Sequence, residues 1–293
     1  EPGTYYRDFE PETLNQNLIL PCYTSSRLLC TVGGMVANNA GGEKSLAYGK
    51  TEKYVEELSM VLRDGKEYTF KKLTKPQLDL KLEQSDFEGA MYENVFNLLD
   101  RNYDLIQKAR PKVSKNSSGY NIWHIWDKEK RTFDMAQLFI GAQGTLGINT
   151  KIKFKLMPVK KEHGMLIVYM NDFNNLPEIV KIVLDFQPGS FESFDDYTLN
   201  LALKYVFDFA PILHVNKLHA AMEFLPEFLM KFEKGTPKLT LIIEFEADNK
   251  PKIERLLMEL NFNLEQFKNV HTKVIQSQEE QDKDWAIRRE SFN

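Results

Sequence analysis

The sequence has few cysteines and lacks a long apolar run. Cys22 and Cys30 are the two cysteines among 293 residues, which excludes a disulfide framework and a cysteine-rich metal site. No apolar stretch approaches the roughly 20 residues that cross a bilayer as a helix. These absences favour a reduced, intracellular setting. We therefore expect a cytoplasmic protein without a transmembrane segment, and peripheral association with the inner face of a membrane stays open.

An excess of positive charge is also missing. The formal net charge is −4 and the pI is about 5.9, so nothing indicates a nucleic-acid partner. Hydrophobic residues make up 42% of the chain and charged residues 27%, which is typical of a globular protein. A chain of 293 residues predicts about two domains.

Several common catalytic motifs do not occur. The sequence has no G-x-S-x-G, H-E-x-x-H, Walker A or G-x-G-x-x-G pattern, which leaves hydrolase, phosphoryl-transfer and Rossmann interpretations without support. Five histidines show no metal-ligand spacing, so we predict no metal site; they are His124, His163, His214, His219 and His271. His214 and His219 could share a surface but have no evident carboxylate partner, so we expect them to be structural.

What the sequence does contain is a glycine-rich segment at residues 31–49, TVGGMVANNAGGEKSLAYG. Glycine permits a left-handed backbone and exposes peptide N–H groups. Successive N–H groups can form a concave nest for an anion such as a pyrophosphate. Thr31, Asn38 and Asn39 add side-chain donors beside the glycines. A tight glycine turn without a ligand is the alternative, and the pattern alone does not decide between them.

Three further segments accompany this one, and together they carry a family resemblance. They are Glu1–Thr4 (EPGT), Asn116–Asn121 (NSSGYN) and Gly141–Ile148 (GAQGTLGI). In this order the segments resemble the FAD-linked oxidases with a PCMH-type (vanillyl-alcohol-oxidase-like) FAD-binding domain. Within that family, the segments most resemble those of the D-lactate dehydrogenase and glycolate oxidase subunit group. For the last segment, a plain helix-to-strand turn is the alternative, and Gln143 stands where the family usually has Glu.

The resemblance implies FAD as the cofactor and a set of residues that contact it. Pro21 and Thr24–Ser26 match the family more loosely than the glycine-rich segments do. The implied cofactor-binding residues are Thr24, Ser26, Thr31, Gly33, Gly34, Asn38, Asn39, Gly41, Gly42, Tyr48, Gly49, Gly144, Thr145, Gly147 and Ile148.

The segment Trp285–Glu290 (WAIRRE) resembles a W-x-L-R-E motif of the family, in which the arginine holds the substrate carboxylate. The fork of a guanidinium matches a carboxylate with two parallel hydrogen bonds. Arg288 is in register with that arginine, and Arg289 is a rival. The alternative is an ion pair on the helix surface with Glu290 or Asp284.

The activity implied by the resemblance is oxidation of a small D-2-hydroxy acid, such as lactate, glycolate or 2-hydroxyglutarate, to its 2-oxo acid by hydride transfer to the flavin. A quinone or a redox protein would reoxidise the flavin. No catalytic residue is assigned, because the family's base and metal histidines would follow Asn293. Two alternatives stay open: other alcohol, lactone or ether-lipid chemistry on the same fold, or a fragment that binds flavin without catalysis or is inert.

The resemblance also implies the architecture, an α+β fold in two parts. Residues 1–158 would be the second subdomain of a PCMH-type FAD-binding domain, and residues 159–293 a ferredoxin-like cap domain with an antiparallel sheet. We expect a fragment that lacks both ends, because the sequence opens within a motif and stops at Ser291–Asn293 inside an expected helix.

Hydrophobic periodicity and turn residues predict the elements along the chain. A hairpin is expected at 54–70 around Asp64-Gly65, helical structure over 76–109, a loop at 112–135, a helix at 134–141 and a strand near 151–156. In the second part we expect strands at 165–170, 189–194 and 239–246, and helices at 176–186, 196–205 and 252–260, packed on one face of the sheet. Residues 206–237 are predicted to be a buried helical segment, with an insertion over the active site or an interface as alternatives.

Overall fold

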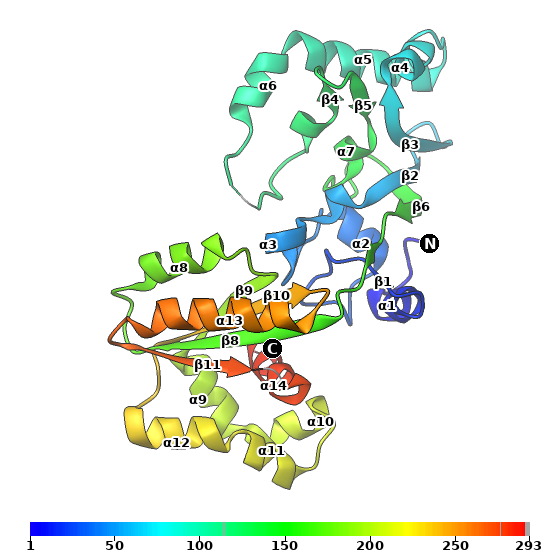
Figure 1. Ribbon diagram of the computed structural model, residues 1–293. Helices are drawn as coiled ribbons and strands as arrows, with labels where there is room; N and C mark the ends of the chain where they lie inside the picture. Colours follow the sequence, from blue (N-terminus) through cyan, green and yellow to red (C-terminus); the bar gives the residue numbers. More distant parts are fainter. Residues whose placement is uncertain (114, 276, 291–293) are drawn as a thin grey trace. The chain divides into compact units, whose positions relative to one another are not determined.

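The chain divides after Val159 into two units, each with its own core, in a computed structural model that describes residues 1–113, 115–275 and 277–290 (Figure 1). The segment Ser291–Asn293, for which the sequence predicts a helix, lies outside the described residues. None of the described helices combines the length and the apolar character needed to cross a bilayer. The units cover residues 1–159 and 160–293.

The first part of unit 1 is built from short elements around a small core. These are α1 (Tyr6–Leu14), β1 (Leu18–Ile19), α2 (Val32–Ala37), α3 (Ser45–Tyr48) and the 3-10 helix η1 (Thr51–Lys53). Tyr6, Met35 and Tyr54 are buried together in this core. Strand β1 pairs with β7 (Met157–Pro158), which ties the start of unit 1 to its end.

An antiparallel sheet organises the rest of unit 1. The hairpin of β2 (Val55–Val61) and β3 (Glu67–Thr74) confirms the predicted one, with Gly65 in its turn at φ 79°. Strand β6 (Ile148–Phe154) pairs with β2 and leaves its lysines exposed, as its alternating pattern predicts.

The connecting region of unit 1 confirms the predicted helical stretch and differs from the prediction in the loop that follows. The helical stretch is three helices, α4 (Lys75–Leu82), α5 (Phe87–Arg101) and α6 (Tyr103–Ala109). Asp86 caps α5 by accepting a hydrogen bond from Gly89 N at 2.9 Å, which starts a new helix there. The expected loop at 112–135 contains η2 (Ile122–His124), β4 (Trp126–Asp127) and β5 (Thr132–Asp134), followed by α7 (Ala136–Phe139). The sheet order is β4-β5-β3-β2-β6.

Unit 2 is a four-stranded antiparallel sheet in the order β11-β8-β10-β9. Its main elements are β8 (Glu162–Met170), α8 (Leu176–Asp185), β9 (Ser190–Asp195), β10 (Leu239–Ala247), α13 (Lys250–Glu265) and β11 (Val270–Ile275). The succession strand, helix, two strands, helix, strand is the ferredoxin-like arrangement. This confirms the fold class that the resemblance implies for the second part.

Helices cover both faces of this sheet, where the sequence predicts one covered face. Helices α8 and α13 pack on the face of Leu166 and Val168. The opposite face, with Met165 and Ile167, carries further helices (Figure 1). These are α9 (Asp196–Lys204), η3 (Val206–Asp208), α10 (Phe209–Ile212), α11 (Lys217–Glu223), α12 (Leu225–Lys234) and α14 (Gln278–Glu290). Residues 165–170 are buried throughout, which reflects their unbroken apolar run.

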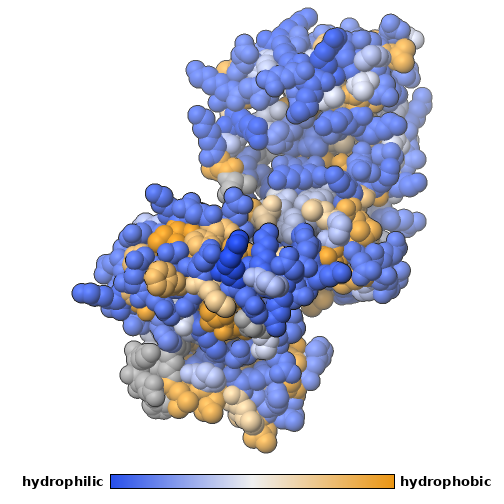
Figure 2. Space-filling view, viewed as in Figure 1, coloured by the Kyte–Doolittle hydropathy of each residue, from blue (hydrophilic) through white to orange (hydrophobic). Residues whose placement is uncertain are grey.

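The helices between β9 and β10 bury some of their apolar side chains and leave others exposed. Phe209 and Phe224 are buried in the core of unit 2, in keeping with the predicted buried helical segment. Figure 2 shows hydrophobic side chains gathered on the outer side of α11 and α12. The exposed apolar residues there are Leu218, Met222, Leu225 and Leu229.

Candidate cofactor site

The glycine-rich segment folds as a short helix and a turn rather than as an open nest. Thr31 caps α2, and its Oγ1 accepts a hydrogen bond from Gly34 N at 3.2 Å. Gly33 N donates to the carbonyl oxygen of Pro2 at 2.8 Å, and Gly42 N donates to Ser45 Oγ at 2.7 Å. These N–H groups are therefore engaged within the protein, and the expected anion nest at the glycines is not formed.

Close backbone approach explains the glycines instead. A Cβ placed on Gly33 would lie 2.6 Å from Pro2 Cβ, and one on Gly42 would overlap the carbonyl oxygen of Tyr23. Gly33, Gly34, Gly41 and Gly42 are not among the positive-φ residues of the described chain. Gly33 thus lets the Glu1–Thr4 segment pack on α2, and Gly42 lets the chain pack on Tyr23 and Thr24. Thr24 and Ser26 share a hydrogen bond of 3.0 Å beside this contact.

The two glycine-containing motifs lie side by side. Gly141 N donates to the Val36 carbonyl at 2.9 Å, and Gln143 N donates to the Ala37 carbonyl at 2.8 Å. Left-handed backbone at Gly141, Gln143 and Gly144 shapes this turn. The C-terminal end of α2 and the turn before β6 therefore form one structure, although a hundred residues separate them in sequence. Gly34, Asn38, Gly144, Thr145 and Ile148 are the predicted cofactor residues exposed on it, and Gln143 is exposed as well.

The loop 116–121 joins the same assembly. The Tyr120 hydroxyl hydrogen bonds with Thr145 Oγ1 at 2.9 Å, and Asn121 Nδ2 donates to Glu52 Oε2 at 3.1 Å. Glu52 also accepts a hydrogen bond from the buried Asn39 side chain, through Nδ2. All four segments that carry the family resemblance therefore contact one another or a shared neighbour within unit 1.

A cavity of about 770 Å³ opens among these segments within unit 1. Its volume falls in the range of small-molecule and cofactor pockets. Asn39 and Gly49 are the predicted cofactor residues that line it, together with Lys50, Asn121 and Gly141. Other predicted cofactor residues are placed around α2 and the turn before β6, outside its lining. They are Thr24, Ser26, Thr31, Gly33, Gly34, Asn38, Gly41, Gly42, Tyr48, Gly144, Thr145, Gly147 and Ile148.

Basic and acidic side chains both line the cavity. Lys50 is 6% exposed, and its ammonium donates to the Asn116 carbonyl and, at 2.9 Å, to Ser117 Oγ. Burial lowers the pKa of Lys50, and the carboxylate of Glu52 opposes that shift. Arg110 also lines the cavity. Burial likewise lowers the pKa of the lining His124.

Three lining residues carry buried oxygens without a hydrogen-bond partner: Asn121 Oδ1, Thr132 Oγ1 and Asp134 Oδ1. Buried polar atoms usually have partners. Hydroxyl and amino groups of a dinucleotide could donate to such oxygens, so the polar lining fits FAD. The sequence indicates Asn121 through its motif. It gives no signal for Thr132 and Asp134, which lie in the region predicted as a loop.

Arg288 lies in unit 2, on α14. Its Nε and Nη2 donate to Glu192 Oε2 on β9 at 3.2 and 2.8 Å. The alternative that the sequence offers is an ion pair with Glu290 or Asp284; the ion pair that the structure shows joins Arg288 to a strand residue 96 positions away. The rival Arg289 places its guanidinium over the Trp285 ring, 5.2 Å from the centroid.

Three histidines have a carboxylate close by. His163 Nδ1 lies 3.5 Å from an oxygen of Glu244 and of Glu246. His219 Nε2 lies 3.0 Å from Glu223, one helical turn away on α11, and His124 Nδ1 lies 3.9 Å from Glu52 Oε1. The prediction that His214 and His219 have no carboxylate partner is therefore wrong for His219, because the helical repeat supplies one.

Comparison with known proteins agrees with this assembly. Residues 1–71 match the FAD binding domain family. The chain is 26% identical over 237 residues to a D-2-hydroxyglutarate dehydrogenase of Pantoea ananatis, covering 81% of this chain and 22% of that protein. It is 27% identical over 186 residues to a D-lactate dehydrogenase of Anaerostipes hadrus, covering 64% of this chain and 27% of that protein. The chain thus spans about a quarter of the length of these relatives.

A solved structure gives the fold. An alkyldihydroxyacetonephosphate synthase superposes with a TM-score of 0.59 and 14% identity, covering 97% of this chain and 40% of that chain. At this identity the likeness concerns the fold alone. Residues 1–71 therefore form part of an FAD binding domain, and the chain has the fold of the FAD-linked oxidases, with FAD as its cofactor.

Proposed function

We propose that this chain contributes the flavin-binding and substrate-binding units of an FAD-dependent oxidoreductase that converts a small D-2-hydroxy acid to its 2-oxo acid. The observation that carries the proposal is the backbone pairing of α2 with the Gly141–Gly144 turn, which gathers the FAD-linked motifs in one place. The names of the curated relatives support the 2-hydroxy acid as the substrate class. Lactate, glycolate and 2-hydroxyglutarate are the candidate substrates.

The residues proposed to hold FAD are the predicted set together with Lys50 and Asn121. Lys50 brings a buried positive charge toward an anionic cofactor, and Asn121 brings a buried oxygen that lacks a partner. When bound, FAD supplies the acceptor for the hydride that leaves the hydroxyl-bearing carbon. A quinone or a redox protein is our proposed final electron acceptor.

Arg288 is proposed to bind the substrate carboxylate. Its Nε and Nη2 both donate to Glu192 Oε2, and we propose that the same edge of the guanidinium forms two parallel hydrogen bonds with the substrate carboxylate. Fixing the carboxylate orients the neighbouring C2 carbon, and such positioning is a large part of the rate in two-substrate chemistry. We expect the substrate carboxylate to share or replace the contact with Glu192.

The test is anaerobic reduction of the purified, FAD-loaded chain by D- and L-2-hydroxy acids. We expect the visible flavin band to bleach with a D-acid and to persist with its L-enantiomer. Arg288→Ala should slow bleaching by about 100-fold at low substrate, and Arg288→Lys should restore part of the rate, since lysine keeps the charge without the fork. Arg289→Ala is the matched control and should stay near the wild-type rate.

Two results would contradict the proposal. Bleaching by simple alcohols but by no 2-hydroxy acid would replace the substrate class while keeping the cofactor. Equal losses in the Arg288→Ala and Arg289→Ala variants would remove Arg288 from the proposed role, because a general effect on α14 would then explain both.

A further inference from the structure

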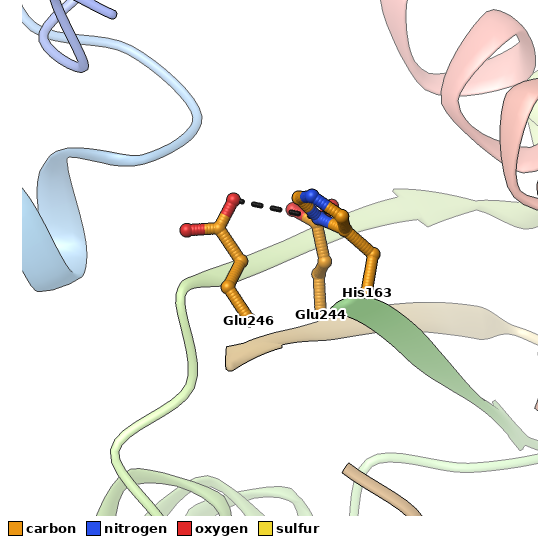
Figure 3. A group of neighbouring side chains, drawn as sticks. All are labelled: His163, Glu244 and Glu246. Atoms are coloured by element: carbon orange, nitrogen blue, oxygen red, sulfur yellow. Dashed lines mark ion pairs between the residues drawn. The ribbon is translucent and has the colours of Figure 1, made fainter. Parts of the chain in front are cut away.

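Three potential metal ligands meet on one face of the sheet in unit 2. His163 lies on β8 directly opposite Glu246 on β10, and Glu244 is two residues before Glu246 on the same strand. Because side chains alternate along a strand, all three project from the same face (Figure 3). We call these residues the His163 triad.

The distances within the triad match those between ligands of one small cation. His163 Nδ1 lies 3.5 Å from Glu244 Oε1 and 3.5 Å from Glu246 Oε1. One ligand atom from each residue lies within 4.8 Å of the other two. In a tetrahedral zinc site with bonds of about 2.1 Å, neighbouring ligand atoms are about 3.4 Å apart.

The imidazole is oriented for such a role from outside the triad. His163 Nε2 lies 3.1 Å from the carbonyl oxygen of Lys160. A carbonyl oxygen only accepts, so Nε2 must carry the hydrogen, and Nδ1 is the nitrogen presented to the two carboxylates. Histidines that bind metals commonly donate their second nitrogen to a carbonyl or a carboxylate in this way.

Charge and burial favour a cation among these groups. The side chains of Glu244 and Glu246 are 9% and 7% exposed, and that of His163 is 28% exposed. Two carboxylates held close together and largely out of water repel each other and lose solvation. A divalent ion bound by all three side chains would reduce the repulsion between the two carboxylates.

We propose that His163, Glu244 and Glu246 bind a divalent first-row transition-metal ion of the zinc type. One imidazole and two carboxylates form a nitrogen–oxygen donor set that suits such ions. Three protein ligands leave a coordination position for water or a small anion. The site lies on the sheet face that also carries Glu192, the partner of Arg288, since Glu192 pairs with Ile242 on β10. The inference does not depend on the proposed oxidoreductase activity.

Calorimetric titration of the metal-free chain with Zn²⁺ tests the site. We expect a single site in the wild-type chain, and a loss of affinity of at least about tenfold in each of His163→Ala, Glu244→Gln and Glu246→Gln. The matched control is His219→Ala, since His219 and Glu223 form a histidine–carboxylate pair on α11 with no third potential ligand among the residues that the structure describes. That variant should bind like the wild type.

A measurement on the wild-type chain keeps the test valid if a variant fails to fold. X-ray absorption of the Zn²⁺-loaded chain should show one imidazole and oxygen ligands at about 2.0–2.2 Å, with no sulfur. A shell with sulfur or several imidazoles would overturn the proposal, as would binding that His163→Ala leaves unchanged. Absence of saturable binding would also overturn it and leave the triad an ion pair.

Discussion

At the scale of single residues, the substrate proposal depends most on the ion pair of Arg288 and Glu192. In the ion pair, Glu192 occupies nitrogens that a substrate carboxylate would need. We predict that Glu192→Gln strengthens binding of D-2-hydroxy acids by about tenfold, because the competing negative charge is removed while the size is kept. Substrate titration of the flavin absorbance measures the change.

Glu254→Gln is a suitable control for that experiment. Glu254 lies on α13, which packs on the opposite face of the sheet, and it pairs with Lys250 on the helix surface. It should leave substrate affinity unchanged. Weaker binding in Glu192→Gln would mean that Glu192 holds Arg288 in a binding conformation instead of competing with the substrate.

Asp284 makes unit 2 sensitive to pH. It is buried on α14, its Oδ2 has no hydrogen-bond partner, and burial raises its pKa from 3.8 to about 7. Between about pH 4 and pH 7 the native state holds this proton and the unfolded state has lost it. The free energy of unfolding should therefore fall as pH rises through that window, by about 2–4 kcal/mol.

Asp284→Asn isolates this contribution, because asparagine stays neutral at every pH. Urea unfolding at pH 5 and pH 8, followed by the fluorescence of Trp285, measures the free energy of unfolding. We expect the wild type to lose more stability than the variant between the two pH values. Equal losses would show that Asp284 titrates normally in the folded state.

At the scale of elements, α2 shows how the glycine motif acts through packing. A Cβ on Gly33 would lie 2.6 Å from Pro2 Cβ and 2.8 Å from the Pro2 carbonyl oxygen, whereas one on Gly34 would lie 3.2 Å from Thr31 Oγ1 alone. We predict that Gly33→Ala destabilises unit 1 by about 1–3 kcal/mol through overpacking.

Gly34→Ala is the matched substitution in the same helix. Alanine is the better helix former, so the net change in stability should stay within about 1 kcal/mol. Thermal unfolding followed by the fluorescence of Trp123 and Trp126 compares the two variants. Equal stability of both would contradict the view that Gly33 is needed for contact with the Glu1–Thr4 segment.

The elements that sequence predicts well are those with strong local signals. The β2–β3 hairpin has alternating residues and Asp64-Gly65, and α13 has Asn249, whose side chain accepts a hydrogen bond from Lys252 N at 3.1 Å. Strands β4 and β5 have two and three residues, too few to show a period, and they exist because β3 offers an edge.

The candidate sites likewise differ in how far the sequence alone predicts them. The glycine motifs are visible in the sequence, but only the folded structure reveals that Pro2 and Ser45 accept hydrogen bonds from their N–H groups. The His163 triad brings together residues about eighty positions apart, and only the pairing of β8 with β10 aligns them. Spacing rules for metal ligands apply to local motifs and miss such a group.

At the scale of the molecule, the two units have separate cores. Leu257 is fully buried in a cluster of unit 2, and Leu58 is fully buried in a cluster of unit 1. We predict that Leu257→Ala destabilises unit 2 by about 2–5 kcal/mol and leaves unit 1 unchanged. Hydrogen exchange should rise at the amides of β8 and β10 but not at those of β2.

Leu58→Ala is the reciprocal variant, with the opposite expected pattern of exchange. Faster exchange in both units from either substitution would indicate that the units unfold cooperatively. Such a result would change how stability measurements on the whole chain are interpreted, since a single free energy would then describe both units.

The central claim is that the motifs gathered around α2 bind FAD, and one measurement tests it most directly. The purified chain is incubated with FAD, separated from free cofactor by gel filtration, and its visible spectrum is recorded. We predict that the protein peak carries a stoichiometric amount of FAD with a flavin band altered from that of free FAD. A folded, colourless protein peak, with all FAD eluting as the free molecule, would contradict the account.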